Sequence, residues 1–234
     1  MRLKNNAETS LWISNTDLIS GMFVIFLFIA VALMQQSEAM RETVIGITDE
    51  SNKAIIQLRE NIKKRFSEEE IVRYHLNTDE PGYAYFNDGD TKFAQGSAEI
   101  PESFKNDLRI FLPKYLEAVA ACDEKSIKEI RIEGHTSSEW SADMDPNAAY
   151  FYNMKLSQER TRAIIEYAFT LPELVPYHNI MKTKLTANGL SSSHLILNED
   201  NTENANASRR IEFRIVANDK LTIDKIREAV NKKL

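Results

Sequence analysis

The residue that stands out chemically is Asp17, a carboxylate inside the apolar run 11–34 (LWISNTDLISGMFVIFLFIAVALM). As a helix this run rises about 36 Å, which is enough to cross a bilayer core of about 30 Å. An aspartate within a spanning helix costs about 2.5–3.5 kcal/mol at the centre and usually faces a bundle interior or a water path. Ser20 and Gly21 lie one turn further on, so the face around Asp17 is small and polar. We expect Asp17 to carry protons, and one helix cannot shield it, so a partner membrane protein is implied.

Two other interpretations of this run stay open. In the first, the run is a cleaved signal peptide that begins with the basic residues Arg2 and Lys4. Residues 18–29 would then be its apolar region, and residues 30–32 (AVA) its cleavage site. The apolar run continues past that site and carries a carboxylate at its head, which argues against cleavage. In the second, the helix is a plain anchor, and Asp17 faces water at the membrane interface.

The charges on the two sides of the span predict its orientation. Arg2 and Lys4 precede it, opposed by Glu8, whereas residues 35–43 (QQSEAMRET) carry two acids and one base. Basic residues favour the cytoplasmic side of a membrane. We therefore expect a single-pass protein of a bacterial inner membrane, with residues 1–10 as a cytoplasmic tail and the long remainder in the periplasm.

Residues 35–80 are expected to form a periplasmic linker, helical to about residue 75. Its apolar positions follow steps of three and four with one gap of seven, as in an amphipathic helix. They are Met40, Val44, Ile47, Ala54, Leu58, Ile62 and Phe66. Two copies can pair along this stripe as a short parallel coiled coil, or the helix can fold back on its own domain. The turn-rich segment 77–82 (NTDEPG) marks the domain boundary.

The remaining sequence predicts an α+β domain over residues 81–218, followed by a C-terminal helix over 219–234. Short alternating segments read as strands, and longer segments with helical period read as helices. We expect strands at 82–86, 127–133, 182–187 and 210–216, and helices at 100–121 and 156–169, with Pro113 starting a second helix or kinking the first. The order is β-α-β-α-β-β, a sandwich with helices on one face of a sheet.

Three motifs in this domain carry a family resemblance. Gly134-His135-Thr136 follows an alternating strand, residues 153–160 (NMKLSQER) open a helix, and residues 208–213 (SRRIEF) begin the last strand. The set resembles the OmpA-like peptidoglycan-binding domain, whose pattern is strand-GHTD, N-x-x-L-S-x-x-R-A and N-R-R-V-E. The resemblance covers about residues 86–217. Three motifs in the correct order make it specific, where each alone would be weak.

The resemblance implies a site for the carboxylate- and amide-rich peptide stem of peptidoglycan. Its residues are Tyr152, Asn153, Leu156, Arg160, Ser137 and Arg209. The family arginine at the position of Arg160 clamps the diaminopimelate carboxylate, and a guanidinium suits a carboxylate because it binds it bidentately. We expect Asn153 to cap the following helix or to turn its amide toward the ligand. The family aspartate after GHT is replaced by Ser137, which puts the affinity or the exact stem in question.

The segment between the first two motifs is long and aromatic. Trp140, Tyr150, Phe151 and Tyr152 either rim the groove or pack the insertion. His135 of the GHT motif is expected to be structural, bonding the backbone at a tight turn. The chain has one cysteine and no histidines at ligand spacing, so we expect no metal and no cofactor.

The two halves together resemble the MotB-type stator plan, and the residues W-I-S-x-x-D-L with Tyr152-Asn153 resemble the ZorB family of Zorya anti-phage defence systems more closely. This resemblance implies a proton-driven motor subunit that forms a homodimer within a ring of a MotA-like multi-span partner, ZorA. A flagellar stator subunit and a purely structural membrane-to-wall tether are the alternatives. The chain lacks G-x-S-x-G, HExxH and P-loop motifs, so we expect no covalent catalysis. The net charge of −6 with no basic block argues against a nucleic-acid partner.

Overall fold

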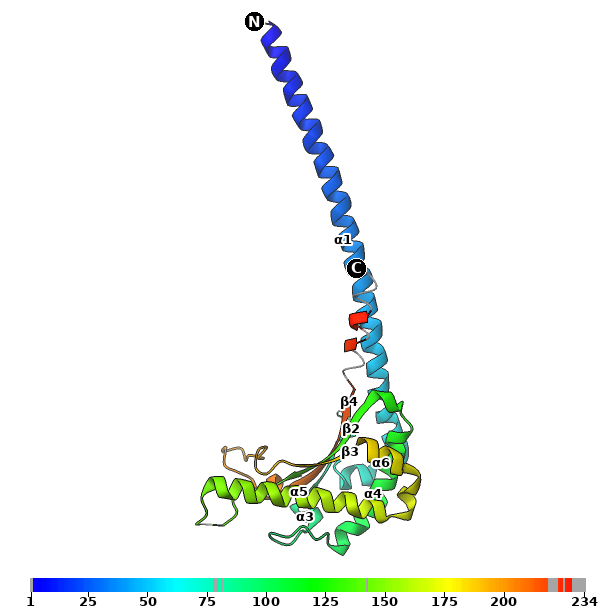
Figure 1. Cartoon of the computed structure of the whole chain (residues 1–234), viewed down its shortest axis with the longest axis vertical. Coiled ribbons are helices and arrows are strands. Elements are labelled where there is room, and N and C mark those ends of the chain that lie inside the picture. Colours follow the sequence, from blue (N-terminus) through cyan, green and yellow to red (C-terminus); the bar gives the residue numbers. More distant parts are fainter. Residues whose placement is uncertain are drawn as a thin grey trace. The chain divides into compact units, whose positions relative to one another are not determined.

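The computed structural model describes the chain except residues 1, 78–79, 81, 142, 219–222, 225 and 229–234. The side chains of residues 2–17, 47–52 and 54–55 also lie outside the described part. The chain divides into two units, one formed by residues 1–49 with 222–234 and the other by residues 50–221 (Figure 1). Of the predicted C-terminal helix, residues 223–224 and 226–228 are helical, and the others lie outside the described residues.

The first unit holds most of helix α1 (Arg2–Arg65). Within it, Leu18–Gly46 is long and apolar enough to cross a membrane, although a signal sequence would meet the same test of length and composition. Phe26 and Phe28 expose 68% and 70% of their surface, so this is not the buried core helix of its own chain. Asp17 is helical in its backbone, and its side chain lies outside the described residues.

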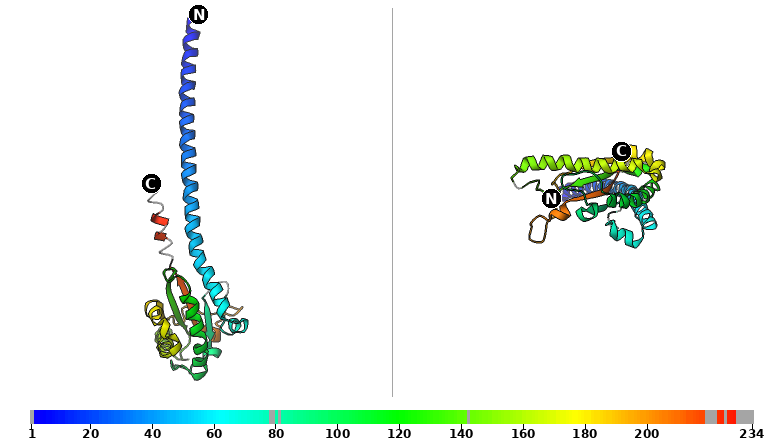
Figure 2. Two further views of the ribbon diagram at one scale, coloured as in Figure 1. Left: turned by 90° about the vertical axis from the view of Figure 1, so that its right-hand side faces the viewer. Right: turned by 90° about the horizontal axis from the view of Figure 1, so that it is seen from below.

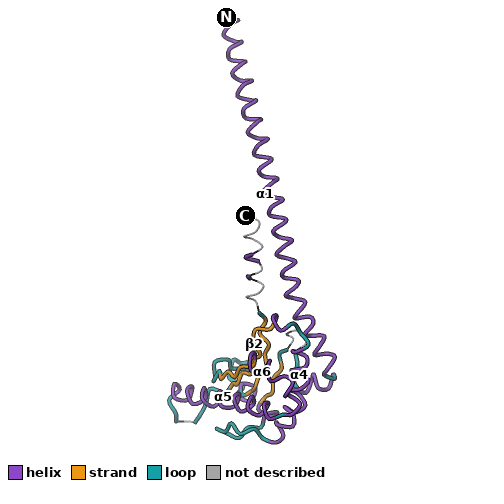
Figure 3. The backbone as a smooth tube through the Cα atoms, turned by 45° about the vertical axis from the view of Figure 1, so that its right-hand side comes forward, coloured by secondary structure: helices purple, strands orange, loops and turns teal. Residues whose placement is uncertain are grey.

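The second unit is built on a four-stranded sheet, with strand order β1-β4-β2-β3 (Figure 3). The strands are β1 (Ala84–Asn87), β2 (Ile127–His135), β3 (Leu185–Gly189) and β4 (Arg210–Ala217). β4 runs antiparallel to both β1 and β2, and β2 and β3 are parallel. The two long helices are α4 (Glu102–Ala120) and α5 (Pro146–Thr170). The α+β class and the predicted β-α-β-α-β-β order are confirmed.

Both long helices pack on one face of this sheet, α5 against β2 and β3 and α4 against β1 and β4, and Figure 2 shows them beside it. Alternate strand residues face the helices, since the side chains of a strand point to opposite faces in turn. Phe213 of β4 lies 5.0 Å from the ring centre of Phe111 in α4, and Phe86 of β1 lies 5.3 Å from the same ring. From α5, Ile164 is fully buried in this core. The register then places Glu133 opposite Glu212 on the other face.

The last turns of α1 pack into this core. Leu58 and Ile62 are 4% exposed, and Phe66, the first residue after α1, is 3% exposed. Asn61 donates a hydrogen bond to the Ala118 carbonyl of α4, at 3.3 Å. These three apolar residues of the predicted stripe are therefore used within the chain, as the fold-back alternative requires, and are not free for a coiled coil. Pairing through the earlier part of the stripe stays a prediction.

Two predicted boundaries are wrong, and of the two alternatives for Pro113 the start of a second helix is excluded. Helix α4 runs through Pro113 without ending, at the cost of the hydrogen bond that the Arg109 carbonyl would otherwise accept, and the kink stays a prediction. Helix α5 begins at Pro146 because Asp145 caps it, accepting from the Ala148 amide at 3.0 Å. Residues 182–184 end helix α6 and do not start β3. The short elements are α2 (Glu68–Arg73), α3 (Asp88–Thr91), η1 (Glu124–Ser126), η2 (Pro172–Tyr177), α6 (His178–Lys184) and α7 (Ala205–Ser208).

Candidate functional site

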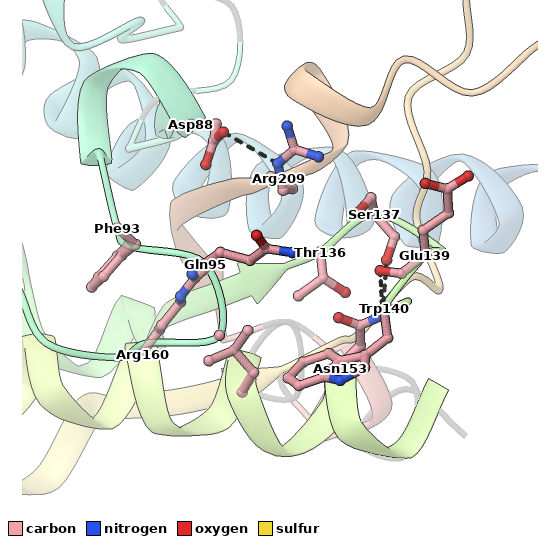
Figure 4. Close-up of a pocket in the computed structure, with 12 residues that line it drawn as sticks. Asp88, Phe93, Gln95, Thr136, Ser137, Glu139, Trp140, Asn153, Arg160 and Arg209 are labelled. Atoms are coloured by element: carbon pink, nitrogen blue, oxygen red, sulfur yellow. Dashed lines mark hydrogen bonds and ion pairs between the residues drawn. The ribbon is translucent and has the colours of Figure 1, made fainter. Parts of the chain in front are cut away.

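A pocket of about 480 Å³ lies where β2 ends beside the middle of α5 (Figure 4). Five chain segments contribute to it: α3, the loop after α3, the loop after β2, α5, and the residue before β4. Its lining residues are Asp88, Phe93, Gln95, Gly96, Thr136, Ser137, Glu139, Trp140, Asn153, Leu156, Arg160 and Arg209. Five of the six predicted binding residues are therefore brought together here. Tyr152, the sixth, lies outside the lining.

Two glycines on neighbouring strands let α5 lie close enough to form this pocket. Gly134 of β2 pairs with Gly189 of β3. A Cβ atom on Gly134 would come within 2.6 Å of the Ser157 carbonyl oxygen, and one on Gly189 within 2.5 Å of the Gln158 amide nitrogen. No side chain fits at such distances from a helix backbone. The glycine of the GHT motif is thus needed for α5, which carries Asn153, Leu156 and Arg160 of the site, to lie this close to the sheet.

Asn153 fastens the loop after β2 to α5. It lies in the third turn of α5, so the prediction that it caps the helix is wrong. Its side chain is buried, and its amide Nδ2 donates to the Ser137 carbonyl at 3.1 Å and to the Glu139 carbonyl at 3.3 Å. Because both acceptors belong to the loop, the amide fixes one wall of the pocket.

Arg160 fixes the opposite wall. Its Nε donates to the Ser97 carbonyl at 2.8 Å, and its Nη2 donates to the Ala94 carbonyl at 3.2 Å. The guanidinium carbon lies 4.6 Å above the centre of the Phe93 ring. The residue is 7% exposed, and burial lowers the pKa of its guanidinium to about 10, with Asp88 opposing and Arg209 reinforcing the shift. It stays charged at neutral pH.

The charge of Arg160 has no carboxylate within salt-bridge distance among the described residues. Two carbonyls and an aromatic ring stabilise this buried cation in place of a carboxylate. They use Nε and one hydrogen of Nη2, so that Nη1 and the second hydrogen of Nη2 remain for an anionic ligand in the pocket that Arg160 lines. A carboxylate is the group that fits such a fork.

Arg209, the residue before β4, differs from Arg160 in this respect. Its Nε lies 3.2 Å from Asp88 Oδ2, and its Nη2 also bonds Asn206. Both groups of this ion pair are about one-third exposed. The pair therefore presents one cation and one anion to the same pocket, which suits a ligand that carries both an ammonium and a carboxylate. Arg210 points to the other sheet face and pairs with Glu212.

The other predicted residues line the space between these walls. Ser137, which stands in place of the family aspartate, is 7% exposed. Thr136 beside it is 3% exposed, and its hydroxyl has no hydrogen-bond partner in the described structure. Leu156, 7% exposed, gives the apolar floor from α5. Glu139 is an exposed acid at the rim.

Of the aromatic residues Trp140, Tyr150, Phe151 and Tyr152, only Trp140 lines the pocket. Trp140 lines the pocket and stacks on Tyr152, with ring centres 5.4 Å apart and planes at 26°. Tyr150 and Phe151 form a second contact, edge to face at 5.7 Å. All three of residues 150–152 lie in α5, so they are not part of a loop insertion. Trp140 is thus the aromatic residue that reaches the pocket itself.

Glu133, His135 and Glu212 form the one group of ligand-type side chains close enough to hold a metal ion in the described part of the chain. They lie on the sheet face away from α4 and α5. Arg210 Nε contacts Glu212 at 2.6 Å, and Arg214 lies 3.4 Å from Glu212 and 3.7 Å from Glu133. Two guanidinium groups therefore already balance the two carboxylates, so this donor set does not fit a cation.

His135 has a place in that cluster. It is 3% exposed, and its Nε2 lies 3.7 Å from a Glu212 oxygen. Burial would raise the pKa of the Glu212 carboxyl, but His135 and Arg210 outweigh burial and hold that pKa well below its usual range. The predicted backbone hydrogen bond of His135 is absent, since neither ring nitrogen has a hydrogen-bond partner in the described structure. Its neighbours, not a turn, hold it in place.

Sequence reasoning missed the loop between α3 and α4. Phe93 packs under the Arg160 guanidinium, and the carbonyls of Ala94 and Ser97 orient it. Every residue has a backbone carbonyl, so the two hydrogen bonds to carbonyls cannot be predicted from residue types. The one sequence signal was Gly96, whose positive φ of 66° shapes the loop.

Comparison with known proteins gives two matches that each cover half of the chain or more. The OmpA family model matches residues 92–210. The chain is 34% identical to the Zorya protein ZorB of Escherichia coli (strain Crooks) over 224 residues, which covers 95% of this chain and 94% of that one.

Two solved structures also resemble the chain. One is a protein described as MotB-like from Desulfovibrio vulgaris (17% identity, 77% of this chain and 99% of that one, TM-score 0.46). The other is the periplasmic domain of Helicobacter pylori MotB (15% identity, 65% and 85%, TM-score 0.44). With identities below 25% and TM-scores below 0.5, neither adds to what the family match says.

Proposed function

Since this chain belongs to the ZorB family of OmpA-domain proteins, we propose that it is the wall-anchored stator subunit of a proton-driven rotary motor in the inner membrane. In this proposal it acts in anti-phage defence with a MotA-like multi-span partner of the ZorA type. The observation that carries the anchoring role is the buried guanidinium of Arg160, which faces a pocket without a carboxylate partner among the described residues. No covalent chemistry on a substrate is involved.

In the anchoring step, a stem-peptide carboxylate of peptidoglycan enters the pocket and accepts hydrogen bonds from Arg160. The Asp88–Arg209 pair, at 3.2 Å, offers the ligand a second cation and an anion for its ammonium. The guanidinium is already held by the loop carbonyls, so little side-chain entropy is lost on binding. Ser137 offers a hydroxyl where the family pattern has an aspartate, so the anion for the ligand must come from elsewhere in the pocket.

The proton step rests on Asp17 and on the family membership. In a homodimer two such carboxylates would lie within the ring of partner helices. A desolvated carboxylate favours its neutral form, so it takes up a proton from the periplasmic side and releases it when it meets water on the cytoplasmic side. Each neutralisation removes the cost of a buried charge and lets the partner ring move to its next position. The anchored domain keeps the dimer from turning with the ring.

The proton step is tested by Asp17→Asn in the full chain, expressed with its partner gene in cells challenged with phage. We expect protection to be lost while the amount of complex in the membrane is unchanged, because asparagine has a similar size but cannot ionise. Glu60→Gln is the matched control, an exposed acid on the same helix but outside the candidate span Leu18–Gly46. Protection by Asp17→Asn equal to wild type contradicts the proton role and leaves the structural tether.

The anchoring step is tested by co-sedimentation of the full chain in detergent with purified peptidoglycan. Arg160→Ala is expected to abolish sedimentation. Arg160→Lys should weaken it at least tenfold, because an ammonium keeps the charge but loses the bidentate fork. Arg162→Ala is the control, since Arg162 lies two residues further on and pairs with Glu166 at the surface. Unchanged sedimentation of both Arg160 variants would remove the pocket from wall binding.

A further inference from the structure

We propose that the stacked rings of Trp140 and Tyr152 form a sugar subsite, which binds the glycan strand of peptidoglycan beside the stem-peptide pocket. The inference rests on the proposed wall-binding function and extends it from the peptide stem to the sugar that bears the stem. Trp140 lines the pocket, and Tyr152 extends the aromatic surface beyond it. In the view of Figure 4, Trp140 lies beside Asn153, away from the Asp88–Arg209 pair.

Tyr152 differs from the core aromatic residues because it is both stacked and exposed. Tyr74 and Tyr115 are each 1% exposed in the core, whereas Tyr152 leaves 51% of its surface exposed although it contacts Trp140. A large ring left half in water gains little from burial. Aromatic residues with one face packed and the other open are typical of binding surfaces.

The loop that carries Trp140 is held firmly on both sides. Asn153 bonds the carbonyls of Ser137 and Glu139, the latter directly before Trp140. The Ser138 amide donates to Glu203 Oε1 at 3.0 Å, and the Ser138 hydroxyl bonds the same carboxylate. Because these bonds come from α5 and from the loop before α7, the indole is placed before any ligand arrives. Such preorganisation reduces the entropy lost on binding.

The chemistry of the platform fits a sugar ring. The face of an aromatic ring has a negative electrostatic potential, and the axial C–H groups of a pyranose present a weakly positive, apolar face to it. The stem peptide is attached to the lactyl group of the glycan, so a stem bound at Arg160 brings its sugar to the rim of the same pocket. A carboxylate-binding pocket with a flat aromatic surface next to it matches these two connected parts.

The experiment uses the full chain in detergent and two probes that differ only in the sugar. One is a diaminopimelate-containing stem peptide that carries its N-acetylglucosamine–N-acetylmuramic acid disaccharide, and the other is the same stem without it. Wild type should bind the first probe about five- to tenfold more tightly, the factor expected of a single aromatic contact. Trp140→Ala and Tyr152→Ala should lose this advantage, so that each variant binds the two probes with equal affinity. Tyr152→Phe should keep it.

Phe151→Ala is the matched control, because Phe151 is 69% exposed at the position before Tyr152 in α5 and takes no part in the stack. If Trp140→Ala and Tyr152→Ala weaken both probes equally, the platform contacts the stem and the sugar subsite is refuted. If wild type shows no preference for the disaccharide probe, the subsite is also refuted. A wild type that binds neither probe contradicts the proposed wall anchor itself, which is a different result.

Discussion

Replacing Gly134 by alanine should disturb the fold and the pocket together. Gly134 lies in β2 under α5, and the added Cβ would stand 2.6 Å from the Ser157 carbonyl oxygen and 3.0 Å from Thr161 Cγ2. Ser157 and Thr161 are both fully buried, so neither can turn away. The nearest obstacle is backbone, and relief therefore requires the helix to withdraw from the sheet.

The size of the effect follows from this overlap. An ordinary contact of a Cβ begins at about 3.4 Å, so α5 must withdraw by about 0.8 Å at this point. Inserting a carbon into a well-packed core typically costs about 1–3 kcal/mol, and we expect the upper half of that range because backbone must move. Asn153 and Arg160 belong to the same helix and would move with it. Binding geometry tolerates about 0.5 Å, so peptidoglycan binding should fall at least tenfold even in the folded protein.

The assay is thermal unfolding and peptidoglycan co-sedimentation of the full chain in detergent, with three variants compared. Gly134→Ala should lower the unfolding midpoint by several degrees and weaken sedimentation. Thr161→Ser in the Gly134→Ala background should not restore either property, because it removes only the 3.0 Å contact. Gly89→Ala is the control, whose Cβ would meet one side-chain oxygen at 3.1 Å. A Gly134→Ala protein with wild-type stability and binding would refute the close approach of α5.

Two further predictions concern side chains that position the site or stabilise the domain. Asn153→Ala should lower the free energy of unfolding by about 2 kcal/mol, because it leaves two loop carbonyls without their donor. Denaturant titration measures this loss, and a value below about 0.5 kcal/mol would contradict the role of the amide. The lowered pKa of Glu212 means that its ionised form stabilises the folded state above the ordinary glutamate pKa of about 4.5, and that this contribution is lost as the pH falls below it. The unfolding midpoint of wild type should therefore fall between pH 7 and pH 3. The midpoint of Glu212→Gln should be lower at pH 7, because Arg210 loses its partner, and should fall less over the same range. Parallel pH profiles of the two proteins would contradict this.

Local sequence patterns predicted much of the fold. The three motifs at residues 134–136, 153–160 and 208–213 were sufficient to predict the family, and alternation of apolar and charged residues placed β2 and β4 within two residues of their observed ends. The apolar run around Asp17 was equally local, since length and hydropathy alone decide whether a helix can span a bilayer. Such features are visible in sequence because each depends on residues within a few positions of one another.

Contacts between distant segments were beyond local patterns. The repeat of Leu58 and Ile62 fits either a coiled coil or the domain core, and only the tertiary structure shows that the core takes them. Asn153 looked like a helix cap because the motif begins there, but Asp145 caps the helix and frees Asn153 to bind a loop.

The amino-acid sequence by itself determined the family, the α+β class and the residue types of the site, Arg160 above all. The tertiary structure decided how that guanidinium is held, by the carbonyls of Ala94 and Ser97 and the ring of Phe93, more than sixty residues away. It also decided that Trp140 stacks on Tyr152 at the rim. The physical reason is that backbone carbonyls and ring stacking act through space. Their partners are fixed by where the chain folds back, and no residue type in the sequence marks that place.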